Sequence, residues 1–209
     1  MIHDFTKEGL DPKGFEAKHD TRFLTLEIAK LSDRLWSRKH QHLRHSWMEL
    51  AGELAPSFQA LMDVDALGPQ AQFIGVDTEK GVIQRCQEHY QGCPASWHHG
   101  PLASAIRPLQ AFPDVGVLVF DSEYSAKGKP IRNDVKVLAR FAQRQYEALG
   151  GFLLVINVAA NPRDVSEKDI QAYRMMLSRE TGVDIPPEAL HRYVSRTVPM
   201  IWTAIRFGF

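Results

Sequence analysis

Three acidic residues stand at the ends of short apolar runs and are the first candidates for chemistry. Glu49 lies in the first run, and Asp77 and Asp121 directly follow two later ones. If these runs are strands of one parallel sheet, their carboxyl ends meet at the edge where such sheets bind ligands. A carboxylate there can accept hydrogen bonds from two neighbouring hydroxyl groups, so Asp77 is placed to hold a ribose.

The apolar runs predict strands that are covered on both faces. Residues 72–76, 115–120 and 151–158 are nearly continuous in Val, Ile, Leu and Phe, which is typical of strands in a parallel sheet between two layers of helices. Helical patterns alternate with these runs, and one of them begins at a capping-box-like pair, Ser166 and Asp169. We therefore predict a doubly wound α/β fold with a mostly parallel sheet and helices on both faces.

Both ends of the chain extend this core. Residues 1–43 are expected to form an N-terminal arm and a helix, and residues 44–209 the α/β domain. Asp20 is placed to cap that helix. The alternation in residues 201–207 predicts a last strand that pairs with 192–196 or inserts antiparallel into the sheet. The helix is predicted from an apolar stripe at 4-3-4 spacing: Leu24, Ile28, Leu31 and Leu35.

Composition and sequence pattern argue against collagen-like, membrane-spanning and secreted proteins. The 209 residues are 44% hydrophobic and carry 25 Lys and Arg against 25 Asp and Glu, a formal net charge of zero. This balance argues against a phosphate backbone as the main partner. No apolar run is long enough to cross a membrane, the N-terminus lacks a signal-peptide pattern, and two cysteines are too few for a disulfide framework. We therefore expect a cytoplasmic protein with no membrane partner.

The order of these parts resembles the class I S-adenosylmethionine-dependent methyltransferases, which have a Rossmann-like fold. Residues 49–56, ELAGELAP, occupy the place of the family's glycine-rich loop, and QFIGVDTEKGVIQRC that of the strand whose acid binds the ribose. Residues 96–106 resemble the segment that flanks the adenine, VLVFDSEY the fourth-strand motif and EALGGFLLVINV the fifth strand. The resemblance covers roughly residues 44–160. It implies a methyltransferase with S-adenosylmethionine as its small-molecule cofactor and a small molecule, RNA or protein as its acceptor.

The resemblance also implies roles for single residues. Asp121 and Tyr124 are the catalytic candidates: Asp121 as a general base or to orient the acceptor beside the methyl group, and Tyr124 by stacking on a planar acceptor. Asp77 is expected to bind the ribose, and Gly52 to lie near the methionine end. The expected cofactor-binding residues are Glu49, Ala51, Gly52, Glu53, Asp77, Thr78, His99 and Asp121.

The loop in residues 49–56 departs from the family pattern. It keeps only Gly52 of the usual glycines, and Glu53 and Ala55 stand where the backbone must approach the cofactor. Cβ atoms there would crowd the methionine tail, and the Glu53 carboxylate would repel the cofactor's own carboxylate. A catalytically silent, methyltransferase-like subunit that acts by binding a partner is therefore a second hypothesis.

A third hypothesis is a metal-dependent exonuclease. Residues 76–79, VDTE, and residues 120–123, FDSE, each resemble the strand-borne Asp-x-Glu that holds metal ions in such enzymes. Four residues are candidate zinc ligands: Cys86, His89, Cys93 and His98. Their spacing lacks the short pairs of known zinc sites, so we expect no metal.

Two basic segments suggest contacts with anions. His40, His42 and His45 lie in a basic run that is either a solvated helix end or a small patch for phosphate or nucleic acid. Lys127 and Arg132 form a basic rim just past Asp121, which would suit an anionic acceptor. The N-terminal arm and helix are expected to cover the site or to mediate a homodimer.

Overall fold

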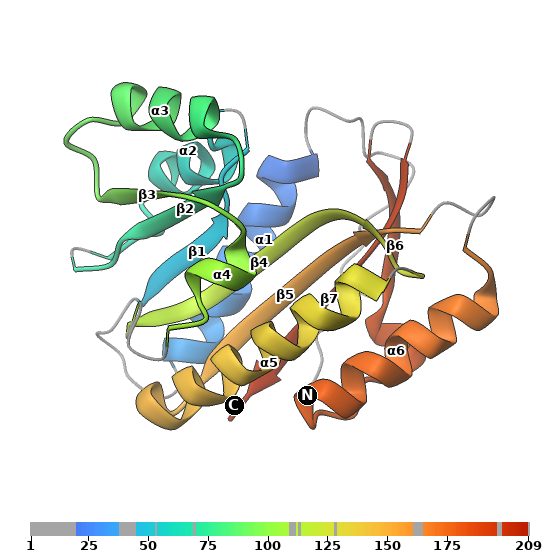
Figure 1. The fold of residues 1–209 in the computed structure, drawn as a ribbon. Helices are drawn as coiled ribbons and strands as arrows, with labels where there is room; N and C mark the ends of the chain where they lie inside the picture. Colours follow the sequence, from blue (N-terminus) through green and yellow to red (C-terminus); the bar gives the residue numbers. More distant parts are fainter. Residues whose placement is uncertain are drawn as a thin grey trace.

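In the computed structural model, helices lie on both faces of a central β-sheet (Figure 1). The structure describes residues 20–37, 45–52, 54–68, 70–108, 112, 114–127, 129–160, 165–195 and 198–208. The expected N-terminal arm, His40, His42 and Glu53 lie outside the described residues. Among the described residues, no helix combines the length and apolar composition needed to cross a lipid bilayer.

The described strands form one seven-stranded sheet in the order β3-β2-β1-β4-β5-β7-β6. β1 to β5 pair in parallel, whereas β7 lies antiparallel between β5 and β6. The predicted mostly parallel sheet and its antiparallel C-terminal strand are therefore confirmed. The strands are β1 Ser46–Leu50, β2 Phe73–Asp77, β3 Ala95–His99, β4 Val115–Ser125, β5 Phe152–Ala159, β6 His191–Ser195 and β7 Val198–Phe207.

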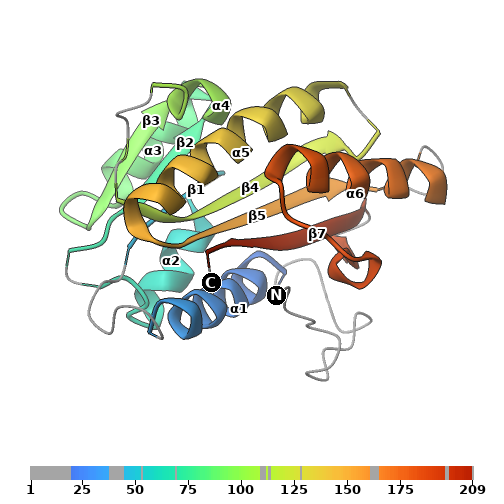
Figure 2. The ribbon, with the colours of Figure 1, turned by 90° about the horizontal axis from the view of Figure 1, so that it is seen from below.

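The helices divide between the two faces of the sheet. Figure 2 shows α5 and α6 over one face and α1 and α2 over the other. Apolar side chains of α3 join the core shared with α1 and α2, and those of α4 join the core under α5 and α6. The helices are α1 Asp20–Ser37, α2 Pro56–Asp63, α3 Lys80–His89, α4 Leu102–Ala105, α5 Lys129–Leu149 and α6 Glu167–Thr181, with a short 3-10 helix η3 at Pro187–Ala189.

The strands are apolar on both sides because both faces of the sheet are covered. Along β4, Leu118 and Phe120 belong to the core under α5 and α6, while Val117 and Val119 belong to the core under α1, α2 and α3. Successive side chains of a strand point to opposite faces, so a strand between two helical layers is apolar at every position. This arrangement explains the nearly continuous apolar runs of the sequence.

The capping box predicted from the sequence begins α6, and glycines end α5 and α6. The Asp169 N–H donates to Ser166 Oγ at 3.3 Å, and the Ser166 N–H donates to Asp169 Oδ2 at 2.9 Å, which completes the capping box of α6. Gly150 and Gly182 follow α5 and α6 with φ of 76° and 70°. Glycine adopts this left-handed conformation without a Cβ penalty, and both helices therefore end there.

One strand at the sheet edge was not predicted as a strand. Residues 95–99 form β3, whereas the sequence predicts only that residues 96–106 flank the adenine. Polar residues such as Ser96 and His98 interrupt the segment, and all of it is half-buried or exposed, so it shows no apolar run. Gly75 of the neighbouring β2 lacks a Cβ, and the Trp97 ring occupies that space.

The other difference lies at the end of β4. This strand continues through Asp121 to Ser125, whereas the apolar run predicts an end at residue 120. The pairing of β4 with β5 shifts register between Asp121 and Ser125, because β4 has two more residues there than β5. Asp121 therefore lies within an irregular extension of the strand and not in the loop after it.

Candidate functional site

The β1–α2 loop, residues 51–55, lies at the carboxyl end of β1, and its backbone is unusual. Gly52 has a φ of 58°, and Leu54 and Ala55 have φ of 54° and 42°. Glycine adopts such left-handed values freely, whereas Leu and Ala are strained there. The loop therefore needs left-handed backbone at two positions where the sequence provides no glycine.

Asp77 is the last residue of β2, and its carboxylate is tied to this loop. Asp77 Oδ2 accepts a hydrogen bond from the Gly52 N–H at 3.2 Å, and Oδ1 accepts one from the Glu79 N–H at 2.8 Å. Each carboxylate oxygen has a further lone pair that these bonds do not use. The Asp77 side chain thus connects the β1–α2 loop with the segment that enters α3.

Three other expected residues lie at the same edge of the sheet. The Ala51 N–H donates to the Val76 carbonyl oxygen at 2.9 Å, which joins the loop to β2. His99 Nε2 lies 3.1 Å from the Thr78 carbonyl oxygen and must donate to it, since a carbonyl oxygen only accepts. The structure therefore brings Ala51, Thr78 and His99 together with Gly52 and Asp77.

Glu49 differs from these residues because it is buried, with 4% of its surface exposed. Trp47 Nε1 donates to Glu49 Oε2 at 2.9 Å, and Ser57 Oγ donates to Glu49 Oε1 at 2.6 Å. Burial raises the pKa of Glu49 to about 8, although both hydrogen bonds lower it, and the negative charge of Asp121 adds to the increase. Burial of Glu49 thus favours its neutral form more strongly than the two hydrogen bonds favour its ionised form.

Asp121 lies on β4, next to β1 in the sheet, and faces β5. Asn157 of β5 is its register partner, and Asn157 Nδ2 donates to Asp121 Oδ1 at 2.8 Å. Asn157 is buried, whereas Asp121 is half-buried. The amide therefore fixes the orientation of a carboxylate that other groups can still reach. Tyr124 also belongs to β4, but its side chain lies outside what the structure describes.

Sequence reasoning missed the residues that hold these acids. Trp47, Ser57 and Asn157 each donate a hydrogen bond to Glu49 or Asp121. A signal existed for Asn157, because it is the polar residue inside the apolar run 151–158. Nothing in the spacing of Trp47 or Ser57 connects them with Glu49.

Among the described residues, no three His, Cys, Asp or Glu side chains lie close enough to share a metal ion. Asp77 and Asp121, the first acids of the two Asp-x-Glu motifs, lie on β2 and β4, which β1 separates. Of the candidate zinc ligands, Cys86 is buried on α3 with its Sγ 4.0 Å from the Gly52 carbonyl oxygen.

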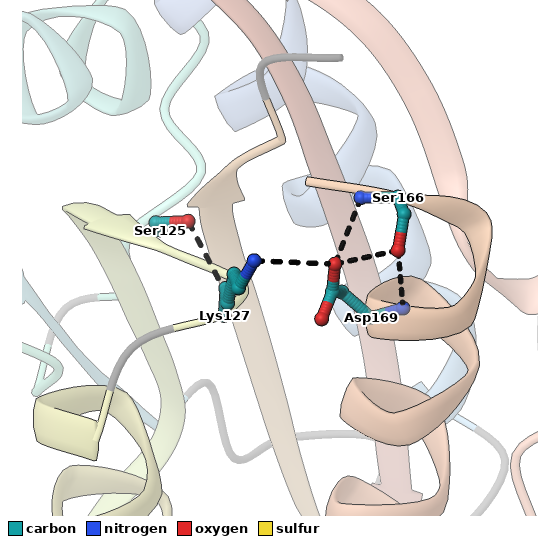
Figure 3. A network of polar contacts seen from close by, with 4 residues as sticks. All are labelled: Ser125, Lys127, Ser166 and Asp169. Carbon is teal, nitrogen blue, oxygen red and sulfur yellow. Dashed lines mark hydrogen bonds and ion pairs between the residues drawn. The ribbon is translucent and has the colours of Figure 1, made fainter. Parts of the chain in front are cut away.

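Lys127, expected in a basic rim, follows β4 and contacts the start of α6. Its Nζ lies 3.8 Å from Asp169 Oδ2, which also accepts hydrogen bonds from the Ser166 N–H and Oγ (Figure 3). The Lys127 N–H donates to Ser125 Oγ at 3.3 Å. The Lys127 side chain is largely exposed at this end of the sheet, with its ammonium group paired to Asp169.

His45 directly precedes β1 and therefore lies at the amino-terminal end of this strand, opposite the end that carries the β1–α2 loop. Its ring centroid is 3.9 Å from that of Trp36 at the end of α1. Of the three histidines proposed for a phosphate patch, His45 alone belongs to the described part of the chain. It packs against an aromatic ring there.

Known structures with the same fold share little sequence with this chain. The plantazolicin methyltransferase BamL, solved with a triazolic desmethylPZN analogue and SAH, is 10% identical with a TM-score of 0.50, over 82% of this chain and 60% of BamL. A SAM-dependent methyltransferase from Leishmania major is 13% identical with a TM-score of 0.51, over 92% of this chain and 74% of that one. An antibiotic-related methyltransferase is 11% identical with a TM-score of 0.50, over 84% of this chain and 94% of that one.

Sequence comparison adds no closer relative. No protein-family model matches the chain, and no curated protein matches it. The chain spans about three fifths of the length of BamL. The similarity therefore concerns the fold, in which the antiparallel β7 is as predicted. The chain has the fold of the class I S-adenosylmethionine-dependent methyltransferases.

Proposed function

We propose that this chain binds S-adenosylmethionine at the carboxyl ends of β1, β2 and β3 and transfers its methyl group to an acceptor. Asp77 carries the proposal, because its carboxylate ends β2 directly beside the β1–α2 loop. In open α/β sheets this edge is where ligands bind, and an acid there suits the hydroxyl groups of a ribose. BamL, which has this fold, was solved with SAH.

The residues at this edge fit such a cofactor. A Cβ placed on Gly52 would meet nothing within 4 Å, so there is open space beside the loop. The lone pairs that Asp77 does not use for Gly52 and Glu79 can accept two ribose hydroxyls. We assign Thr78 and His99, both exposed at this edge, to the adenine side. When bound, the cofactor supplies an electrophilic methyl group on a sulfonium.

The chain's own contribution to the transfer is position and a base. Asp121, oriented by the Asn157 amide, is assigned to accept the proton that an oxygen or nitrogen acceptor loses as its bond to the methyl carbon forms. We assign Tyr124 to the acceptor pocket. The exposed charge of Lys127 favours an acceptor that carries an anionic group.

Calorimetric titration with S-adenosylmethionine and S-adenosylhomocysteine tests the proposal. We expect wild-type protein to bind both, and Asp77→Asn to bind each about tenfold more weakly or worse, because one charged hydrogen-bond acceptor is lost. Asp184→Asn is the matched control, since Asp184 is exposed and lies after α6, away from the cofactor edge. If folded wild-type protein binds neither ligand, the methyltransferase proposal is wrong.

A silent subunit with the same fold is the second candidate, and the strained loop favours it. Leu54 and Ala55 occupy left-handed backbone without glycine, so the loop is less adaptable than a glycine-rich one. Cofactor binding alone does not separate the two candidates. Release of S-adenosylhomocysteine in the presence of acceptor libraries does, because only an enzyme produces it.

A further inference from the structure

The two ends of the β1–α2 loop are joined by a buried side-chain contact. Glu49 precedes the loop and Ser57 follows it, and Ser57 Oγ donates to Glu49 Oε1 at 2.6 Å. Trp47 Nε1 holds the other Glu49 oxygen at 2.9 Å. The contact therefore fixes the base of the loop independently of its backbone.

Helix α1 extends this contact by one more hydrogen bond. Thr25 Oγ1 donates to Ser57 Oγ at 3.1 Å, and both residues are 3% exposed. Because the Ser57 hydroxyl accepts this bond, its own proton is directed toward Glu49. Thr25, Ser57, Glu49 and Trp47 thus form one buried polar chain that runs from α1 through α2 to β1.

The loop between Glu49 and Ser57 needs such support. Leu54 and Ala55 adopt left-handed φ without being glycine. A residue in this conformation persists only where the surrounding structure holds it there. Tyr90, which directly follows α3, holds the second half of the loop, since its hydroxyl donates to the Leu54 carbonyl oxygen at 2.7 Å. The buried polar chain holds both ends.

We propose that Thr25, Ser57 and Glu49 are positioning residues, which fix the β1–α2 loop in place of the glycines that the loop lacks. Through this buried polar chain, α1 controls the position of the Gly52 N–H beside Asp77. The effect on a ligand rests on the proposed function, because it requires S-adenosylmethionine to bind at this loop. The effect on the loop itself does not.

The experiment compares Thr25→Val with Thr25→Ser in the full chain. Valine has nearly the shape of threonine but no hydroxyl, whereas serine keeps the donor to Ser57. Amide hydrogen exchange of the unliganded protein is followed at Ala51 and Gly52. We expect Thr25→Val to speed exchange at both amides about fivefold, the equivalent of one lost hydrogen bond. Thr25→Ser restores the wild-type rate.

Two controls separate positioning from a general loss of stability. Thr181→Val removes another buried threonine hydroxyl, which donates to the Leu177 carbonyl oxygen at 2.7 Å in α6, and exchange at Ala51 and Gly52 should not respond. The Ala126 amide, which donates to Ala159 at 2.9 Å, reports on the sheet far from the loop and should keep its rate in all variants. Ser57→Ala interrupts the buried polar chain between Thr25 and Glu49. It should therefore speed exchange at Ala51 and Gly52 as Thr25→Val does.

Affinity for S-adenosylhomocysteine is measured on the same variants. We expect Thr25→Val to bind about fivefold more weakly and Thr25→Ser to bind like wild type. If wild-type protein does not bind this ligand, the proposed function is wrong. The exchange rates still show whether the buried polar chain positions the loop. Equal exchange at Ala51 and Gly52 in wild type, Thr25→Val and Ser57→Ala overturns the inference, whatever the affinities are.

Discussion

At the scale of single residues, Glu49 is a carboxyl group whose surroundings favour the protonated form. Burial raises its pKa from 4.5 to about 8, with a further contribution from the charge of Asp121. Between these two values the folded protein holds a proton that the unfolded chain has released. The stability linked to this proton is fully present below about pH 4.5 and is lost as the pH rises through about 8.

Glu49→Gln is therefore expected to flatten the pH dependence of stability. Glutamine cannot ionise, yet its oxygen can accept from Trp47 and its amide can donate to Ser57. From about pH 5 to about pH 8, the free energy of unfolding should fall by up to about 4 kcal/mol more in wild type than in the variant. Urea denaturation across this range measures both slopes. Parallel curves for the two proteins would contradict the raised pKa.

At the scale of the element, the β1–α2 loop combines strain with tight anchoring. Leu54 is 40% exposed, so its side chain contributes little packing, while its φ of 54° is costly for leucine. Glycine removes that cost. The hydrogen bond from Tyr90 goes to the Leu54 carbonyl oxygen and therefore survives a change of side chain.

Leu54→Gly should therefore stabilise the protein, although glycine usually destabilises. We expect the free energy of unfolding to rise by about 1 kcal/mol, because relief of strain outweighs the greater entropy of the unfolded chain. Val64→Gly is the matched control: Val64 is exposed but has a φ of −114°, so only the entropy loss remains and the variant should lose stability. Chemical denaturation measures the free energy of unfolding of both variants. Equal destabilisation by the two substitutions would argue against strain at residue 54.

At the scale of the whole molecule, the sequence predicts the parts of the fold that carry continuous apolar patterns. Runs such as 115–120 become central strands because the helices on both faces leave no position exposed to water. The sequence does not predict β3 at residues 95–99. This edge strand is partly open to solvent and therefore has no continuous apolar pattern. Asp77 could be placed at a strand end from its position after an apolar run. The contact between Thr25 and Ser57 could not be predicted, because Thr25 lies thirty-two residues before Ser57 in sequence and meets it only after α1 packs on α2.

Ligand binding at the strand ends should raise the stability of the whole molecule, because Gly52 and Asp77 come together only in the folded chain. A ligand present at about one hundred times its dissociation constant adds about 2.7 kcal/mol to the free energy of unfolding. For a chain of this size that corresponds to a rise in Tm of about 5–10 °C. We expect this rise with S-adenosylhomocysteine in a thermal melt, and a smaller one for Asp77→Asn at the same concentration. Methionine, which has no ribose, should give no shift. An equal shift in wild type and Asp77→Asn would mean that the ligand binds without the Asp77 carboxylate, so the ribose would have to be held by other groups.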